Sequence, residues 1–126
     1  MRNISFAATP VQLLAGMKNV TRRIGWKKLQ EGQILQAILK GQGLRKGEKV
    51  QKLGYVKVIS LRSERLDAIT DEDVEAEGFP GKSHYWFIEK FMDAFKCKRN
   101  KIVLRIEFTY SLQDPTPKAC GSEGEA

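Results

Sequence analysis

Four residues near the start of the chain carry side chains that can do chemistry or bind an anion. They are Lys18, Thr21, Arg22 and Arg23, in the stretch AGMKNVTRR. A lysine three residues before a threonine is compatible with a phosphate clamp, with an activated hydroxyl, or with a solvated loop that has no further role. The stretch by itself leaves these three interpretations open.

An activated hydroxyl at Thr21 would require an unusual lysine. A threonine hydroxyl is a poor nucleophile at neutral pH and needs a base to take its proton. The only histidine, His84, is far away in sequence, so the candidate base is Lys18. Lysine titrates at about pH 10.4 in water, and it must be desolvated or placed beside other cations to lose its proton near neutrality. Arg22 and Arg23 are cations that could supply this repulsion.

The composition limits the class of protein. A chain of 126 residues, 41% apolar and 29% charged, predicts one soluble globular domain with its own core. The sequence contains no run of eighteen apolar residues and no signal-peptide pattern, so we expect a cytoplasmic protein with no membrane partner. The two cysteines, Cys97 and Cys120, and the single histidine fit neither a disulfide framework nor a metal site. We therefore expect no metal and no cofactor.

Positive charge is concentrated in the first half of the chain. Residues 1–65 contain 14 Lys and Arg against 3 Asp and Glu, whereas residues 66–126 contain 8 against 12. A basic surface of this kind is typical of nucleic-acid binding. The run RRIGWKK adds Trp26, which can stack a base or pack against the core, and Lys27. The segment GQGLRKGEK adds Arg45 and Lys46, and we interpret it as a flexible basic hairpin that could close over a polyanion.

Hydrophobic periodicity and capping residues predict the elements that must position these side chains. Strands are expected over residues 2–8, 33–40, 50–66 and 102–110, with a bulge or bend at Gly54. Helices are expected over residues 9–17, 70–78 and 83–96, with Thr9, Thr70 and Ser83 as N-caps. The TRR triplet is placed in an exposed loop after the first helix, and residues 113–126 are expected to form a disordered tail.

This order of elements predicts an α+β fold, in which a small, mostly antiparallel sheet curls into a barrel with short helices inserted between its strands. Asp73 stands at the third position of the second helix, as an aspartate version of the capping box. In the third helix, Phe87, Phe91 and Phe95 are spaced four apart, and we expect them and Trp86 to be core residues.

Two stretches carry a resemblance to a known family. GMKNVTRR and LDAITDEDVEAEGF, with the elements between and after them, resemble the ASCH domain, a small PUA-like barrel. The similarity extends over residues 3 to about 110, and the domain is assigned to residues 1–112. It implies a cleft that faces RNA or nucleotides. Bacterial members of similar length are amidohydrolases that remove the acetyl group from N4-acetylcytidine, whereas other members are ribonucleases or only bind RNA.

The resemblance also implies roles for three residues. The amidohydrolases use a threonine, a lysine and a glutamate, which by position in the motifs would be Thr21, Lys18 and Glu77. A carboxylate in contact with Lys18 would hold it charged, so Glu77 would serve as a proton shuttle or as an anchor for the edge of a base. Arg22 departs from the amidohydrolases, where a small apolar residue is more usual, and its extra charge favours a ligand that bears phosphate.

We therefore predict a monomer that binds RNA or a nucleotide, without excluding a nucleoside, in a basic cleft. The amidohydrolase and the ribonuclease remain alternatives that would use the same cleft. The residues predicted to bind the ligand are Lys18, Arg22, Arg23, Trp26, Lys27, Arg45 and Lys46.

Overall fold

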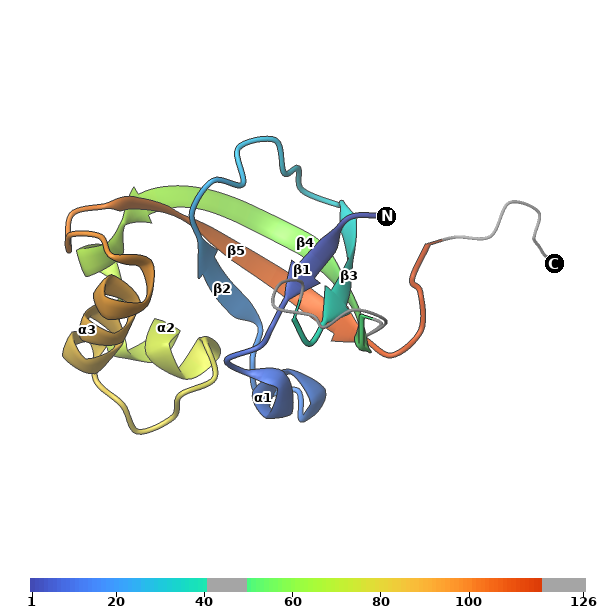
Figure 1. The fold of residues 1–126 in the computed structure, drawn as a ribbon, viewed down its shortest axis with the longest axis horizontal. Helices are drawn as coiled ribbons and strands as arrows, with labels where there is room; N and C mark the ends of the chain where they lie inside the picture. Colours follow the sequence, from blue (N-terminus) through green and yellow to red (C-terminus); the bar gives the residue numbers. More distant parts are fainter. Residues whose placement is uncertain (41–49, 117–126) are drawn as a thin grey trace, which may run out of the picture.

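The computed structural model describes residues 1–40 and 50–116 (Figure 1). The predicted basic hairpin, with Arg45 and Lys46, lies outside the described residues, and so does most of the predicted C-terminal tail. Within the described part of the chain, no helix is long and apolar enough to cross a membrane.

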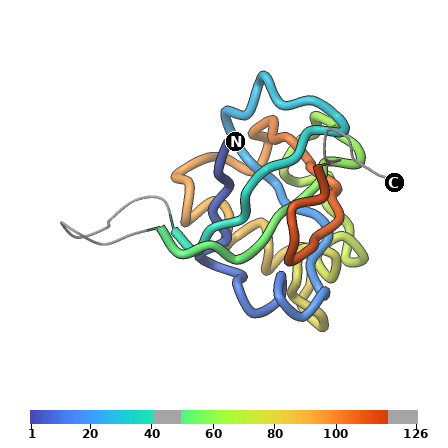
Figure 2. The backbone as a smooth tube through the Cα atoms, turned by 90° about the vertical axis from the view of Figure 1, so that its right-hand side faces the viewer, coloured from blue at the N-terminus to red at the C-terminus, as the bar shows by residue number. Residues whose placement is uncertain are grey.

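Five strands form one sheet in the spatial order β1-β3-β4-β5-β2. The strands are β1 (Asn3–Ser5), β2 (Val20–Arg23), β3 (Ile34–Ile38), β4 (Lys52–Arg65) and β5 (Ile102–Ser111). β1 pairs with β3 in parallel, and the other three pairings are antiparallel. The predicted α+β class and the mostly antiparallel sheet are therefore confirmed. Figure 2 shows that the strands curl around the interior of the molecule.

Closure of the sheet into a barrel is not confirmed. β1 and β2 are the two edges of the strand order, and no pairing joins them within the described residues. A side chain spans these edges instead, because Arg23 Nη2 on β2 donates a hydrogen bond to the Ser5 carbonyl oxygen on β1 at 2.6 Å. β1 has only three residues, so it offers too little backbone for a second ladder of hydrogen bonds.

Glycine allows the long strand β4 to bend. Gly54 has φ +142°, and a Cβ atom at this position would lie 2.6 Å from the Ser111 carbonyl oxygen and 2.7 Å from the Tyr110 ring. The register between β3 and β4 shifts beside it, since Ala37 pairs with Gly54 and Ile38 with Lys52. The bulge or bend predicted at Gly54 is thus confirmed as an irregularity in the pairing of β4 with β3.

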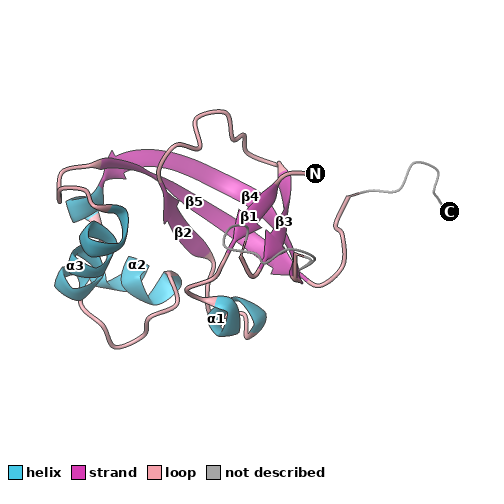
Figure 3. Cartoon of the chain, in the orientation of Figure 1, coloured by secondary structure: helices cyan, strands magenta, loops and turns pink. Residues whose placement is uncertain are grey.

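Four short helical elements complete the fold. They are α1 (Pro10–Leu14), the 3-10 turn η1 (Leu66–Ala68), α2 (Asp71–Ala76) and α3 (His84–Phe95). Thr70 Oγ1 accepts from Asp73 N, and Ser83 Oγ accepts from Trp86 N, so these two predicted N-caps are confirmed. Thr9 is the N-cap residue of α1, as predicted, with Pro10 at the first helical position, but its side chain is buried and makes no capping hydrogen bond. α2 and α3 lie side by side at the end of the sheet away from β3 (Figure 3).

Two apolar clusters stabilise this arrangement. One fills the curl of the sheet and includes Phe6, Leu35 and Phe108; the other lies beneath α3 and includes Leu66 and Val74. Burying each of these side chains contributes roughly 1.5–3 kcal/mol. The predicted positions of Phe87 and Phe91 in the core are confirmed, since both are buried in the second cluster.

The prediction that the TRR triplet lies in an exposed loop is wrong. Thr21, Arg22 and Arg23 belong to β2, which pairs with β5 from Val20 opposite Glu107 to Arg23 opposite Leu104. Thr21 and Arg22 are 4% and 3% exposed. A strand of four residues, three of them polar, has too little hydrophobic alternation to be recognised, and its partner strand comes from the far end of the sequence.

Candidate functional site

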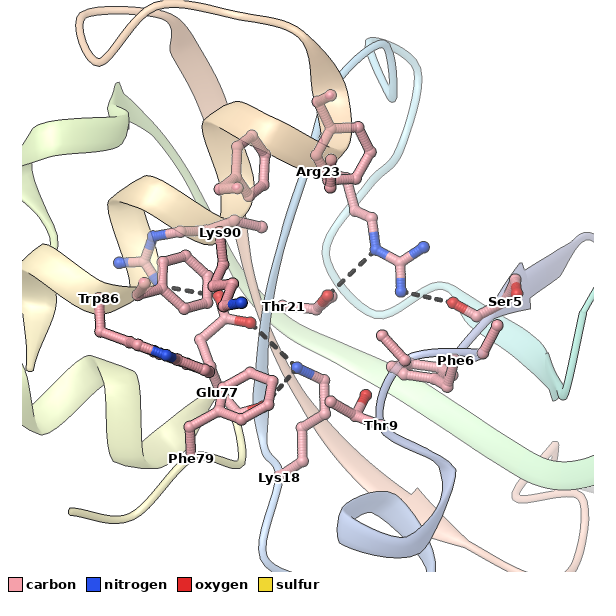
Figure 4. A pocket seen from close by; sticks show the side chains of 17 residues that line it. Ser5, Phe6, Thr9, Lys18, Thr21, Arg23, Glu77, Phe79, Trp86 and Lys90 are labelled. Carbon is pink, nitrogen blue, oxygen red and sulfur yellow. Dashed lines mark hydrogen bonds and ion pairs between the residues drawn. The ribbon is translucent and has the colours of Figure 1, made fainter. Parts of the chain in front are cut away.

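A cavity of about 320 Å³ lies where β2, the segment between β1 and α1, the end of α2 and one side of α3 meet (Figure 4). We call it the main cavity. Its charged and hydroxyl-bearing lining residues are Ser5, Thr9, Lys18, Thr21, Arg22, Arg23, Glu77 and Lys90. Its aromatic lining residues are Phe6, Phe79, Trp86, Phe87, Phe91 and Phe95. The fold thus brings Lys18, Thr21 and Glu77 together, although Glu77 is 59 residues from Lys18 in sequence.

The end of α2 delivers Glu77 to Lys18. Glu77 is the C-cap residue of α2, and helix C-termini leave carbonyl oxygens without partners inside the helix. Lys18 Nζ donates to the main-chain oxygen of Glu77 at 2.7 Å and to its carboxylate Oε1 at 3.0 Å. Asn19 N takes a second of these carbonyls, that of Ala76, at 3.0 Å. The segment before β2 is therefore fixed to the end of α2 by both side chain and backbone.

Opposing effects act on the pKa of Lys18. Burial lowers the pKa of Lys18 below its ordinary value, while the contact with Glu77 opposes this shift. The charges of Arg23 and Arg22 lower the pKa further. Because burial outweighs the carboxylate, the amine lies closer to the neutral form that a general base needs.

Arg22 points to the opposite side of β2 from Thr21 and meets three carboxylates. Its Nη1 donates to Glu77 Oε2 at 3.0 Å, and its Nη2 donates to Glu64 Oε2 at 2.8 Å and to Asp73 Oδ2 at 2.5 Å. Burial alone would lower the pKa of Arg22, but the bonds to Asp73, Glu77 and Glu64 raise it. Arg22 therefore belongs to an internal ion-pair network, and it also lines the main cavity.

Asp73 connects Arg22 to a second arginine. Arg105 donates to Asp73 Oδ2 from Nε at 2.7 Å and to Oδ1 from Nη2 at 3.1 Å. The hydrogen bonds from Arg105, followed by those from Arg22, lower the pKa of Asp73 to about 2. The Asp73 carboxylate therefore does not complete the capping box predicted with Thr70. Only the threonine half of that motif forms.

Arg23 has the opposite environment to that of its neighbour. Its Nε donates to Thr21 Oγ1 at 3.0 Å, its Nη2 donates to the Ser5 carbonyl, and its guanidinium lies 5.2 Å from the centre of the Phe6 ring. No carboxylate of the described chain forms an ion pair with it. Desolvation lowers the pKa of Arg23 to about 10. The wall of the main cavity therefore carries a positive charge that forms no ion pair with the described residues, although the charge of Glu77 partly opposes the lowering of the Arg23 pKa.

The hydrogen of the Thr21 hydroxyl has no hydrogen-bond acceptor among the described residues. The hydroxyl oxygen accepts a hydrogen bond from Arg23 Nε. Lys18 and Thr21 are not hydrogen-bonded, since the hydrogen bonds of Lys18 Nζ among the described residues both go to Glu77. The contact that a lysine base would need is thus not formed here, although such contacts often tighten only when a substrate binds.

Aromatic rings form the other wall of the main cavity. Phe79 meets Trp86 edge to face, with ring centres 5.1 Å apart, and Phe91 lies 4.4 Å from Phe95. Phe95 is 51% exposed. Trp86 and Phe95 were both predicted to be core residues. Trp86 is partly buried against the second cluster and also lines the cavity, whereas Phe95 lines the cavity and is half exposed, so the prediction for Phe95 is wrong. Lys90, exposed and one helical turn before Ala94, was missed as well.

Two further predicted ligand residues, Trp26 and Lys27, lie outside the main cavity. Trp26 and Lys27 line a separate hollow of about 410 Å³, which shares Arg23 with the main cavity. Trp26 packs in part against the core of the sheet, and Arg2 lies 3.8 Å above its ring. His84 receives no part in the cavity; its Nδ1 lies 2.6 Å from Asp71 Oδ1 near the start of α3. No group of three or more potential metal ligands occurs among the residues described.

Comparison with known proteins identifies the fold. The chain is similar to the crystal structure of an ASCH domain from Lactobacillus crispatus, with a TM-score of 0.66, 13% identity, and coverage of 86% of this chain and 78% of that one. It is also similar to a protein of the family DUF984 from Enterococcus faecalis, with a TM-score of 0.52, 14% identity, and coverage of 80% and 68%. No family model matches the sequence, and no curated protein matches it. The chain has the ASCH-domain fold, as its two motifs predicted.

Proposed function

We propose that this protein binds RNA or a nucleotide by accepting a nucleobase in the main cavity. The observation that carries the proposal is the pairing of an aromatic wall with a wall of buried polar groups inside one small cavity. A nucleobase has the matching shape, since its flat faces stack on aromatic rings and its edge forms hydrogen bonds. The ASCH-domain fold supports the same direction.

The size and polarity of the cavity favour a single base. About 320 Å³ lies at the lower end of the range of roughly 300–1,000 Å³ for ligand pockets and leaves no room for a duplex. Lys18, Thr21 and Glu77 offer donors and an acceptor to the edge of the base, and Trp86 and Phe95 offer rings to its faces. Arg22 adds rigidity to the polar wall by holding the second carboxylate oxygen of Glu77.

Tryptophan fluorescence provides a direct test. The chain has two tryptophans, so the Trp26→Phe variant leaves Trp86 as the reporter in the cavity. We expect its emission to change on titration with the four nucleosides, their monophosphates or a short single-stranded RNA. Phe95→Ala should weaken binding about 5- to 150-fold, which corresponds to about 1–3 kcal/mol for a stacked base. Lys28→Ala, an exposed charge change outside the cavity, is the matched control. Equal affinities of the two variants would refute the proposal.

A second candidate is hydrolysis of the acetyl amide of an N4-acetylcytidine-type nucleoside. The observation in its favour is that Lys18, Thr21 and Glu77, which the resemblance assigns to catalysis, line one cavity. The Thr21 hydroxyl hydrogen also has no acceptor among the described residues, so a base could take it. The Thr21 oxygen would attack the amide carbonyl while its proton passes to a neutral Lys18. The C–N bond would then break, with the amine protonated through Glu77, and water would hydrolyse the acetyl-threonine ester.

Chromatography separates this candidate from simple binding. Wild-type protein incubated with N4-acetylcytidine should release cytidine, and Thr21→Ala should abolish release while its binding stays within a few-fold of wild type. Thr21→Ser, which keeps a hydroxyl, should retain part of the turnover. If wild-type protein releases no cytidine, or if Thr21→Ala loses binding and turnover together, threonine is not a nucleophile here. A parallel incubation with a short RNA tests for cleavage.

A further inference from the structure

Arg22 and Arg23 are adjacent in sequence, but their guanidinium groups have opposite surroundings. Arg22 is surrounded by Glu64, Asp73 and Glu77. Arg23 is held by neutral oxygens alone, those of Thr21 and Ser5, and its third nitrogen, Nη1, bonds to no residue in the described chain. A largely desolvated cation without a counter-ion is costly, and an anionic ligand would remove this cost.

The position of Arg23 shows where such an anion would lie. Arg23 lines the main cavity and also the hollow formed with Gly25, Trp26, Lys27, Ser63 and Leu104, which we call the second hollow. Arg23 is therefore a residue that the two spaces share, and its guanidinium contacts Thr21, Ser5 and Phe6 on the side of the main cavity. In Figure 4 the side chain of Arg23 extends from β2, beside Thr21, toward Ser5.

The chemistry of the second hollow suits a nucleotide. Arg23 and Lys27 both line it, and no described carboxylate does. Lys27 is exposed and forms no ion pair with the described residues, so its ammonium is free to contact a phosphate. Trp26 supplies an aromatic surface, and Arg2 above its ring could extend a stack as a planar cation.

We propose that Arg23 binds the phosphate that links two nucleotides of a single-stranded oligonucleotide, with one base in the main cavity and the neighbouring nucleotide in the second hollow. The inference rests on the proposed function for the first base, and it makes the ligand an oligonucleotide rather than a free nucleoside. The lowered pKa of Arg23 agrees with a site that is completed by an anion.

Calorimetry on the full chain tests the inference with sixteen probes, eight with ribose and eight with deoxyribose. The four nucleosides are compared with their homodinucleoside monophosphates, such as cytidine with cytidylyl-cytidine, in both ribose and deoxyribose forms. We expect at least one dinucleotide to bind about tenfold or more tightly than its own nucleoside. A preference for the ribose form would identify RNA as the source of the ligand, and equal binding would extend the site to DNA.

Three variants assign this gain to the phosphate. Arg23→Gln keeps an amide donor near the position of Nε, which contacts Thr21, and removes the charge, while Lys27→Ala alters an exposed side chain. Both should lower the ratio of dinucleotide to nucleoside affinity, whereas Lys28→Ala should leave it unchanged. The slope of log affinity against log salt should become shallower by about 0.7 in Arg23→Gln, as expected for one lost phosphate contact on a single strand.

Each outcome has a distinct meaning. If nucleosides bind but dinucleotides gain nothing, or if Lys27→Ala and Arg23→Gln keep the full gain, the phosphate site is refuted and the base-binding function stands. If dinucleotides bind in a way that depends on Arg23 but not on Phe95, the phosphate site stands and the base is not in the main cavity. If no probe binds, both proposals fail.

Discussion

Replacement of Arg22 by methionine is the sharpest test of the internal charge network. The Arg22 side chain is 1% exposed and donates to Glu64, Asp73 and Glu77, whose side chains are 11%, 18% and 4% exposed. Arg22→Met keeps an unbranched apolar stem but is shorter and carries no charge, so all three carboxylates would lose a partner. Breaking a buried ion pair from one side costs about 3–5 kcal/mol, because the partner is left without compensation.

The three carboxylates each keep one other cation, which places the expected loss at the lower end. Glu77 keeps Lys18, Asp73 keeps Arg105, and Glu64 keeps Arg62. We therefore expect Arg22→Met to lower the free energy of unfolding by about 3 kcal/mol at neutral pH. The buried Nε of Arg22, which has no hydrogen-bond partner among the described residues, adds nothing that would be lost.

Urea unfolding followed by circular dichroism measures this change, with the m-value as a check that the unfolding transition remains comparable. Arg65→Met is the matched control, because Arg65 pairs with Asp67 at the surface, is 58% exposed and should show little change. A loss below about 1 kcal/mol, or a gain in stability, would show that desolvation of the charges cancels their attraction. The network would then have no net role in stability.

Three further predictions concern the framework around the site. Because the folded pKa of Asp73, about 2, lies below the ordinary 3.8, its contribution to stability is fully present above pH 4 and is lost between about pH 4 and 2. The group is partly exposed, so the loss in the free energy of unfolding should be about 1–2 kcal/mol, measured by denaturation at each pH. This loss should be absent in Asp73→Asn. Gly54→Ala should lower stability by about 2–4 kcal/mol through its clash with Ser111, against about 1 kcal/mol for Gly32→Ala, which has open space. Ser83→Ala should cost about 1 kcal/mol in thermal unfolding through the lost cap on α3, and no change would refute that role.

Much of the framework could be predicted because its signals are local. β5 alternates apolar and polar residues over its length, and the caps at Thr70 and Ser83 involve residues three positions apart. β2 could not be recognised, because its pairing partner is more than eighty residues away and the strand is too short to show a period. Thr9 is the predicted N-cap residue of α1, but tertiary packing buries its side chain, which makes no capping hydrogen bond.

The motifs predicted three residues of the candidate site but not how the site is arranged. The motifs indicated Lys18, Thr21 and Glu77, and all three line the main cavity. The sequence could not separate Arg22 from Arg23, because only the alternation of β2 decides that one faces Glu77 and the other faces Ser5. The aromatic wall was missed for a similar reason, since helical spacing does not show whether the edge of an apolar stripe borders the core or a cavity.

The alternation of side chains along β2 also affects the protonation of Lys18, which is in contact with Glu77. A buried lysine held by a carboxylate of its own would keep its proton, which would disqualify it as a base. Here Glu77 divides its carboxylate, with Oε1 on Lys18 and Oε2 on Arg22, while Arg22 also meets Glu64 and Asp73. Burial is the largest influence on the pKa of Lys18 and lowers it, Glu77 opposes this shift, and the charges of Arg23 and Arg22 add to the lowering. Arg22, which departs from the amidohydrolase pattern, therefore lowers the pKa of Lys18 while it holds the second carboxylate oxygen of Glu77.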